Sequence, residues 1–526
     1  MTFIAPRPAR ARWGVFAGAW IALALLASAW AIASPISSGP DEPAHLIKAA
    51  SVVRGELVGP QGSYGNEVTV PNYVSWSNAQ TCFVFNPEVP ANCAPPLVGD
   101  PGELVTGTTT AGYYNPIYYA MVGWPTLVFS NEVGIYAMRI VSAILSSAIL
   151  ALAFMLVSTW RRPTIPLIGL TVAITPMVIY VNGLVNPSSF EISGTIAAFV
   201  AMLTIVTQAD ERLLRERATI LVVVSVLAAN TRTISPLWIA LAILVPLFLL
   251  SWRELGRLLR HRVVLVSAAI IAVGAAFALA WTPISSRLAT EATGGAPATT
   301  VITTVFPDVG QSPFFGFVKM ITLTFTNGAD MIGNFGWMDT PVPATTIVIW
   351  TILLGGILLA GFTLLRGRRA LVGVILLLLA VFLPALIQAA FITSGGFIWQ
   401  GRYGLPIFVM LIIGVAALVG LSLEEQPLRA AGLTRLVLVV LLGFIAGQGY
   451  GFLKALRRNV IGSDTSWKQL ITDPAWIPPG GIAVPLALFA AGLAVLAVVA
   501  LRIHSADRRA LVVRQEEHRG SAARTV

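Results

Sequence analysis

Residues 14–34 read GVFAGAWIALALLASAWAIAS, and the polar stretch SSGPDEPAHLIKAASVVRGEL follows almost at once, over residues 37–57. The first stretch is an uncharged apolar run, long enough to cross a bilayer as a helix, which takes about 20 residues. The second places two adjacent acids, Asp41 and Glu42, where the chain leaves the membrane. Acids at such a boundary need a structural or chemical reason.

The whole chain has the composition of a membrane protein. Of its 526 residues, 56% are hydrophobic and only 11% carry charge, which is too much apolar surface for a soluble domain of this size to bury. We predict a single all-α polytopic membrane domain over residues 1–526 with about twelve transmembrane helices. The predicted spans are 14–34, 133–158, 164–181, 190–208, 218–230, 235–251, 263–283, 344–365, 370–391, 404–421, 435–452 and 482–503. The pair 218–230 and 235–251 is short enough to be a hairpin that does not fully cross.

The distribution of charge predicts which side of the membrane each loop occupies. With both termini placed in the cytoplasm, the segments on that side hold 23 Arg and nine acids, whereas the rest of the chain holds 11 basic and 15 acidic residues. An excess of positive charge marks the cytoplasmic side. The first apolar run is too long for a signal peptide and is interpreted as a retained helix. Abundant Ala, Val, Leu and Arg suggest a bacterial source, so the expected location is the cytoplasmic membrane.

This orientation puts the long loops outside the cell. They are 35–132, 284–343, 392–403 and 453–481, whereas residues 504–526 form a basic cytoplasmic tail. The first outer loop holds the only two cysteines, Cys82 and Cys93. In an oxidising compartment they are expected to form a disulfide, the alternative being two free thiols.

Asp41 and Glu42 are the first candidates for chemistry. Pro43 suits the first turn of a helix and Asp41 an N-cap, so residues 42–56 are predicted to form an amphipathic helix along the membrane surface. One interpretation is that the acids only cap this helix. The other is that a carboxylate at the lipid boundary deprotonates an acceptor hydroxyl. His45 follows on the same face, either to orient a carboxylate or touch a phosphate, or as a surface residue without a task.

The stretch GGFIWQGRYGLPIF, residues 395–408, supplies the candidate cation. Arg402 is expected at the outer end of a span, beside Gln400 and Tyr403. An arginine at this depth requires a partner, and its planar fork suits a phosphate. The alternative is an interfacial anchor within an aromatic belt.

Two further outer segments contain polar residues. The segment 319–343 carries Lys319, Trp337 and Asp339, residue types that suit sugar recognition but also an ordinary loop. Arg232, in the turn between two short spans, needs an acid or phosphate partner, for which Glu191 is one candidate.

Other classes of function have no support in the sequence. The Arg residues lie between apolar runs, with no basic stripe interleaved with aromatics, so no nucleic-acid partner is predicted. We find no phosphate-binding glycine loop and no zinc-spaced His and Cys set. No cofactor or metal site is predicted.

With these residues identified, the chain resembles the bacterial membrane-protein family catalogued as domain of unknown function 2142. The motifs that carry the resemblance are PDEPAH (40–45), YYNPIYY (113–119), NPSSF (186–190), FGWMDTPVP (335–343) and QGRYGLPI (400–407). This family is in turn similar to the C-type (GT-C) glycosyltransferases, which take sugars from polyprenyl-phosphate carriers. The chain departs from the family pattern at Ser188, where an acid is frequent, and at Arg232, where a lysine is frequent.

The resemblance implies a GT-C-like enzyme with Asp41 as catalytic base, Glu42 beside it, and a cation in the later outer loops that holds the carrier phosphate, which we assign to Arg402. The chemistry is consistent with one acidic cluster. A glycosidase usually needs two carboxylates, but a phosphate leaving group is already a stable anion, so one base and nearby cations suffice. The expected function is sugar transfer from a polyprenyl phosphate to a glycan or lipid-linked acceptor in the cell envelope, with inversion.

Two alternatives remain open. A lipid or solute transporter would need polar residues lining a path at mid-membrane depth, whereas most predicted spans lack charge, and no internal repeat is evident. A non-catalytic subunit of an envelope-assembly complex would use Asp41 and Glu42 structurally.

Overall fold

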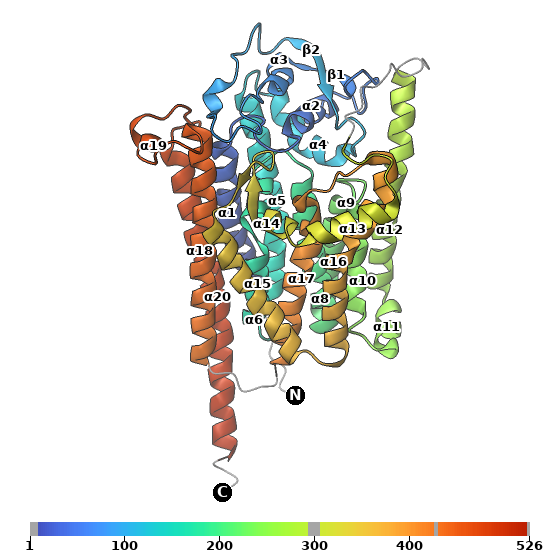
Figure 1. Ribbon diagram of the computed structural model, residues 1–526. Helices are drawn as coiled ribbons and strands as arrows, with labels where there is room; N and C mark the ends of the chain where they lie inside the picture. Colours follow the sequence, from blue (N-terminus) through green and yellow to red (C-terminus); the bar gives the residue numbers. More distant parts are fainter. Residues whose placement is uncertain (1–8, 293–305, 425–429, 523–526) are drawn as a thin grey trace.

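The computed structural model describes residues 9–292, 306–424 and 430–522, with side chains described up to residue 509. Residues 293–305 of the predicted outer loop 284–343 and residues 523–526 of the predicted tail 504–526 lie outside the described residues. Long helices run side by side and are covered at one end by residues 35–132, which we call the head (Figure 1). The start of α1 and the end of α20 both lie at the opposite end (Figure 1).

The bundle consists of long helices with shorter ones between them. The long helices are α1 (Ala9–Ala33), α5 (Val133–Ser158), α8 (Ser188–Thr207), α9 (Glu211–Ala229), α12 (Arg262–Ala292), α15 (Ala344–Leu364), α16 (Gly367–Gly395), α17 (Leu405–Ser422), α18 (Ala430–Ile461) and α20 (Ala483–Ala522). The shorter helices are α6 (Thr164–Ala173), α7 (Pro176–Asn182), α10 (Ser235–Leu247), α11 (Trp252–Leu259), α13 (Pro313–Thr324), α14 (Asn327–Gly333), η4 (Gly401–Gly404) and α19 (Gln469–Thr472). The helix α13 runs across the bundle rather than along it (Figure 1).

Within the described residues, nine helices are long and apolar enough to cross a membrane, or ten if the bent pair α6 and α7 is counted as one span. The predicted number of about twelve spans is therefore not confirmed. The two short predicted spans, 218–230 and 235–251, account for the difference. The helix α10 has 13 residues, about 20 Å, which is shorter than the roughly 30 Å hydrocarbon core. The first third of α9 is charged, so only its second part is apolar.

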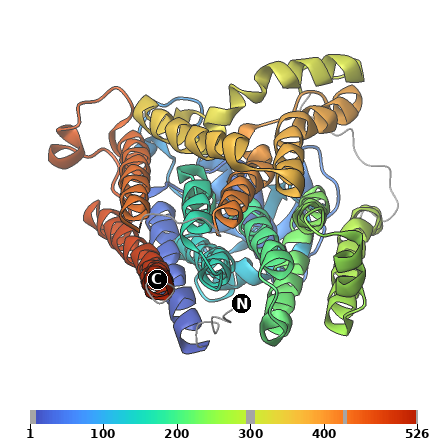
Figure 2. The same cartoon turned by 90° about the horizontal axis from the view of Figure 1, so that it is seen from below.

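The helix α17 forms the centre of the bundle. Every residue of α17 from Leu405 to Leu421 is buried, and α17 packs against α6, α8, α15 and α16 (Figure 2). Close packing uses small residues, because a Cβ at Gly414 would lie 2.4 Å from Leu376 and 3.1 Å from Phe199. The centre of the molecule is therefore filled by a helix.

The head contains short helices and an antiparallel ribbon that the sequence patterns do not predict. Its elements are α2 (Glu42–Val52), β1 (Asn66–Pro71), α3 (Asn72–Ser75), η1 (Trp76–Ala79), η2 (Ala91–Cys93), β2 (Leu104–Thr109), α4 (Pro116–Gly123) and η3 (Trp124–Leu127). The strands β1 and β2 pair from Asn66 with Thr109 to Pro71 with Leu104. A second short ribbon, β3 (Asn334–Phe335) with β4 (Thr340–Pro341), lies outside the head sequence. The structure joins Cys82 and Cys93 in a disulfide.

The prediction of an amphipathic surface helix over 42–56 is wrong in two respects. The helix α2 ends at Val52, since Gly55 follows in the left-handed region (φ +91°), and all of its residues are buried under β1, β2 and α4. Its polar residues do not face water, because each finds an internal partner. Lys48, for example, donates hydrogen bonds to the carbonyls of Leu57 and Gly112. The polar side chains of α2, which suggested a helix at the membrane surface, form hydrogen bonds inside the protein instead.

A buried ion pair fixes α2 to the bundle. The Arg139 guanidinium of α5 donates to both Glu42 carboxylate oxygens, from Nε at 2.7 Å and Nη2 at 2.6 Å, and both side chains are fully buried. Its remaining N–H groups donate to carbonyls that end α1, those of Ala31, Ser34 and Pro35. Arginine at this depth is costly unless paired, so the end of α1, the start of α2 and α5 are held together by one guanidinium.

We expect Glu42→Gln to destabilise the protein by about 3–5 kcal/mol, because it leaves the buried Arg139 charge uncompensated. Unfolding of purified protein in detergent, by heat or denaturant, measures this. The matched control is Glu103→Gln, since the Glu103 side chain is exposed. Equal stability of the two variants would contradict the role given to the pair.

Candidate functional site

Asp41 lies in the turn between α1 and α2, in the left-handed region (φ +61°), which Asp tolerates better than most residues. Asp41 occupies the predicted N-cap position of α2, but its side chain makes no capping hydrogen bond to the helix. Instead the carboxylate remains 46% exposed. The turn is fixed by contacts with residues 184–186. The Pro40 carbonyl accepts a hydrogen bond from the Asn186 side-chain amide, and Gly39 packs so closely on Leu184 that a Cβ at Gly39 would lie 2.5 Å from the Leu184 side chain. Asp41 is thus presented outward from a fixed turn.

The partner of Asp41 is Arg402. One guanidinium nitrogen, Nη2, lies 2.5 Å from the Asp41 carboxylate, although the residues are 361 positions apart. The Arg402 side chain is 2% exposed, and its Nη1 reaches the Pro40 carbonyl at 3.4 Å. Its Nε atom is buried without a hydrogen-bond partner, as is Oε1 of the neighbouring Gln400. The acid is therefore open to solvent, and the cation behind it is incompletely satisfied.

A second arginine, Arg232, completes the cluster. Its guanidinium carbon lies 4.5 Å from the centre of the Tyr403 ring, and that of Arg402 lies 5.2 Å from the same ring. Arg232 also donates to the Ser188 hydroxyl at 3.1 Å, so the two positions that depart from the family pattern contact each other. None of the ion pairs found among the described residues involves Arg232. Two positive groups therefore share one aromatic ring, and only Arg402 pairs with the Asp41 carboxylate.

The suggested ionic partner of Arg232, Glu191, acts differently. Its carboxylate accepts from the Ser235 hydroxyl at 2.7 Å, and that hydroxyl in turn accepts from the Arg232 backbone N–H. Glu191 thus fixes the turn that carries Arg232 and does not bind its guanidinium. The turn is also tied to the start of α4, where the Asn115 amide donates to Asn230 at 3.0 Å.

His45 lies in α2 one turn after Asp41 and is buried. Its Nδ1 lies 2.8 Å from the Tyr119 hydroxyl of α4, and its ring stacks on that of Tyr119. Burial lowers the pKa of His45 to about 3, against the attraction of Asp41, so the ring is neutral. A neutral, hydrogen-bonded imidazole positions the turn and does not supply positive charge.

Two predicted residues are not brought into the cluster. Glu42 is adjacent in sequence to Asp41, but it is fully buried and both of its oxygens are used by Arg139. Lys319, in α13, pairs with Asp308 and lies 4.6 Å from the centre of the Phe397 ring. Within the described residues, neither makes a hydrogen bond to Arg402.

The segment 335–343 contacts the same turn from another side. The Trp337 indole donates to the Ser37 carbonyl at 2.9 Å, four residues before Asp41. Asp339 accepts from the Phe85 backbone N–H and pairs with Arg458 at 3.3 Å, so its carboxylate links the head to α18. Trp337 supports the site, whereas Asp339 joins parts of the fold.

The pKa of Asp41 reflects its surroundings. Burial is the largest single influence and raises the pKa of the carboxyl, but the charge and hydrogen bond of Arg402, together with the charge of Arg232, outweigh it. The net pKa is below the ordinary value near 4. The carboxylate is therefore ionised at neutral pH, and it becomes a stronger base only if another anion takes its place on Arg402.

The arrangement can bind an anion and accept a proton a few ångströms away. Two guanidinium groups suit a phosphate, and the exposed carboxylate suits a hydroxyl. Sequence patterns identify Asp41, Arg402 and Tyr403, but not the contribution of Tyr119, whose motif YYNPIYY (113–119) contributes there only to the family resemblance. In the part of the chain that the structure describes, no group of three His, Cys, Asp or Glu side chains could hold a metal ion.

These features define a polytopic helical membrane protein with an acid–cation cluster beneath a head at one end of its spans. The family of predicted membrane proteins DUF2142 matches residues 24–411, about three quarters of the chain, and the protein belongs to this family. No curated protein matches the chain.

The lowered pKa of Asp41 predicts a pH dependence of stability. A carboxyl with a depressed pKa in the folded state stabilises above its unfolded value, near 3.9, and this contribution is lost as pH falls through the folded value. Asp41→Asn removes the contribution but keeps the turn, because Asn also tolerates the left-handed region. The difference in melting temperature between the native protein and this variant should shrink as pH is lowered from 7 to 3. A difference that is constant over this range would contradict the ion pair.

Proposed function

We propose that this protein is a GT-C-type membrane glycosyltransferase. It takes a sugar from a polyprenyl-phosphate donor and transfers it to a glycan or lipid-linked acceptor of the cell envelope. In this proposal it lies in the bacterial cytoplasmic membrane with both termini in the cytoplasm, so that the head and the Asp41 cluster are outside. Asp41 is the general base, and Arg402 and Arg232 hold the donor phosphate.

The observation that carries the proposal is the pairing of a half-exposed carboxylate with a buried guanidinium at one end of the spans. Asp41 is 46% exposed and Arg402 only 2%. A structural ion pair that is buried needs all of its polar groups bonded to offset the cost of desolvation, as in Glu42 and Arg139. Here the acid remains accessible and Nε of Arg402 is without a partner, which supports a site where an anionic ligand adds to the cluster.

The proposed reaction uses these groups in a fixed order. The donor phosphate binds to Arg402 and Arg232 and competes with Asp41 for the guanidinium, which raises the proton affinity of the carboxylate. The acceptor hydroxyl then gives its proton to Asp41 while its oxygen bonds to the anomeric carbon. The bond between that carbon and the phosphate oxygen breaks, and the phosphate leaves with the electron pair, stabilised by the two arginines. Attack opposite the leaving group inverts the anomeric centre.

The transport alternative fits the structure less well. A transporter needs a path that opens to both sides around a site near mid-membrane. The centre of this bundle is occupied by α17, which is completely buried, and the cluster lies at its N-terminal end. These facts favour chemistry at one end of the spans over passage between them.

Asp41→Asn should lower the rate of sugar transfer about 10²–10⁴-fold, the usual contribution of a general base, without loss of folding. The assay uses protein reconstituted in lipid with a panel of polyprenyl-phosphate sugars. Asp473→Asn is the matched control, because Asp473 is an exposed acid outside the cluster. Full activity of Asp41→Asn would reject the catalytic role.

Arg402→Lys should weaken binding of polyprenyl phosphate about tenfold, the equivalent of one lost charge-assisted hydrogen bond, because lysine keeps the charge but not the planar fork. Binding of the phosphate alone, measured by microscale thermophoresis in detergent, tests this without turnover. Undiminished binding would remove Arg402 from the phosphate site.

A further inference from the structure

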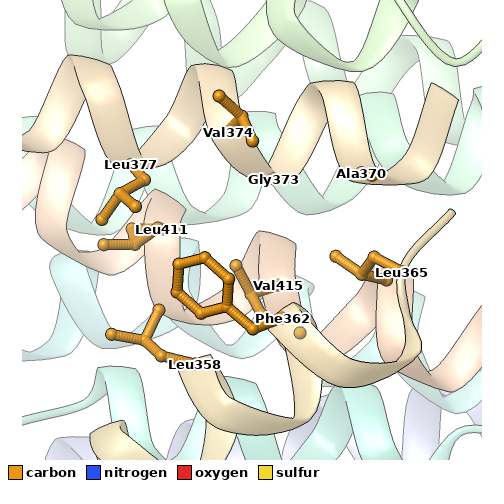
Figure 3. A pocket seen from close by; sticks show the side chains of 10 residues that line it. Leu358, Phe362, Leu365, Ala370, Gly373, Val374, Leu377, Leu411 and Val415 are labelled. Carbon is orange, nitrogen blue, oxygen red and sulfur yellow. The ribbon is translucent and has the colours of Figure 1, made fainter. Parts of the chain in front are cut away.

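An apolar cavity of about 470 Å³, counting the space open to its surroundings, lies between α15, α16 and α17 (Figure 3). All the residues that line it are apolar or glycine. Figure 3 shows Phe362 of α15 and Val374 and Leu377 of α16 around it, with Leu411 and Val415 of α17. Phe362 is 71% exposed, so the cavity is covered on one side by a side chain that faces the surroundings of the bundle.

A second cavity, of about 320 Å³ when the space open to its surroundings is again counted, lies farther along the same two helices. It lies where α13 and α14 cover α16 and the start of α17. Its lining includes Met320, Met331, Ala380, Trp399, Gly404 and Phe408. Gly401 and Gly404, the ends of η4, both line it, and η4 is the turn that carries Arg402 and Tyr403. The second cavity therefore extends to η4, the turn that contributes Arg402 and Tyr403 to the acid–cation cluster.

The two cavities lie in line along α16 and α17, because their lining residues follow each other turn by turn. On α16 they are Ala370, Gly373, Val374, Leu377, Ala380 and Pro384, and on α17 they are Val415, Leu411, Phe408, Ile407 and Gly404. Spacings of three and four residues keep these side chains on one face of each helix. We call this surface the α16–α17 seam.

The length of the seam distinguishes the kinds of lipid chain that could fill it. From Ala370 to Pro384 a helix rises about 21 Å, whereas one leaflet of the hydrocarbon core is about 15 Å thick. An acyl chain of a phospholipid ends within its own leaflet and would fill only part of the seam. A long isoprenoid chain can pass the mid-plane and fill all of it.

We propose that the α16–α17 seam binds the tail of the donor lipid, and that the protein selects long polyprenyl chains over short ones. This inference rests on the proposed function for its phosphate end. Access is from the side, since most of α15 and α16 is not buried in the protein. Chain length matters because a longer chain makes more van der Waals contacts with the walls of the seam, until the seam is filled.

A glycine in the seam offers a direct test. A Cβ at Gly373 would point at Leu365 across the first cavity, 3.1 Å from its Cδ1, so Gly373→Phe fills that part of the seam. The matched control is Gly356→Phe in α15, because Gly356 is exposed and has no atom within 4 Å of its Cβ position. Both variants replace a helical glycine by the same residue, so their direct effects on helix propensity are similar.

The experiment uses a long-chain polyprenyl phosphate with a photoreactive group near the tail end, irradiated in lipid with the native protein and each variant. Cross-links should map to the lower seam, around residues 370–377 and 411–415. Gly373→Phe should reduce them about tenfold, because the ring occupies space that the chain would otherwise fill, and Gly356→Phe should not. Excess unlabelled long-chain phosphate should compete, and a three-unit isoprenyl phosphate or a photoreactive phospholipid should not reproduce the pattern.

Three outcomes would overturn the inference: cross-links scattered over the outer surface, cross-links unchanged in Gly373→Phe, or equal labelling by the phospholipid probe. Labelling does not require turnover, so the seam and the enzymatic function can fail separately. Specific labelling without transfer by any donor would reject the glycosyltransferase. Equal transfer from short-tailed and long-tailed donors would reject selection by the seam.

Discussion

The bidentate ion pair between Glu42 and Arg139 is the interaction on which the geometry of the cluster depends. Arg139 donates hydrogen bonds to one carboxylate and to three backbone carbonyls in and just after the last turn of α1. A guanidinium this deep is stable only with all these bonds, and they leave little freedom to the turn between α1 and α2. That turn is where Asp41 lies, so a buried pair determines where an exposed acid points.

The two adjacent acids thus have different tasks because their surroundings differ. Glu42 faces the bundle and is neutralised by a fully buried arginine, whereas Asp41 faces outward and stays partly exposed while it pairs with the buried Arg402. His45 and Lys48, which with Glu42 make α2 look amphipathic, bind Tyr119 and backbone carbonyls under the head. The head therefore converts a surface-like helix into a buried platform, and its ribbon and disulfide stabilise that cover.

The functional proposal and the seam proposal concern one continuous region. Arg402 lies in η4 at the N-terminal end of α17, and the seam follows α17 away from that turn. A lipid phosphate has two unlike ends, and a polar cluster joined to an apolar groove is the arrangement that suits both. The central, fully buried position of α17 makes it a rigid support for the cluster and for one wall of the groove.

Much of the fold could be predicted from residues that are close in sequence. Apolar runs near 20 residues define most of the membrane-length helices, and the error in number comes from α9 and α10, whose charged start and short length put them below that limit. The ribbon of β1 and β2 could not be predicted, because its strands are short and separated by a long loop. Asp41, one of two adjacent acids, and Arg402, a lone cation, stand out in the sequence at predicted helix ends.

The sequence by itself determined that this chain crosses a membrane many times, that its charged residues gather in the connections, and that Asp41 and Arg402 require partners. Hydropathy and charge act locally, so they can be read in chain order. The tertiary structure alone decided which partner each one found: Arg139 for Glu42, Arg402 for Asp41, and Asp308 rather than the cluster for Lys319. Ion pairs form between groups that packing brings together. The partners here are 97 and 361 positions apart in the sequence, and hydrophobic periodicity carries no information over such a separation.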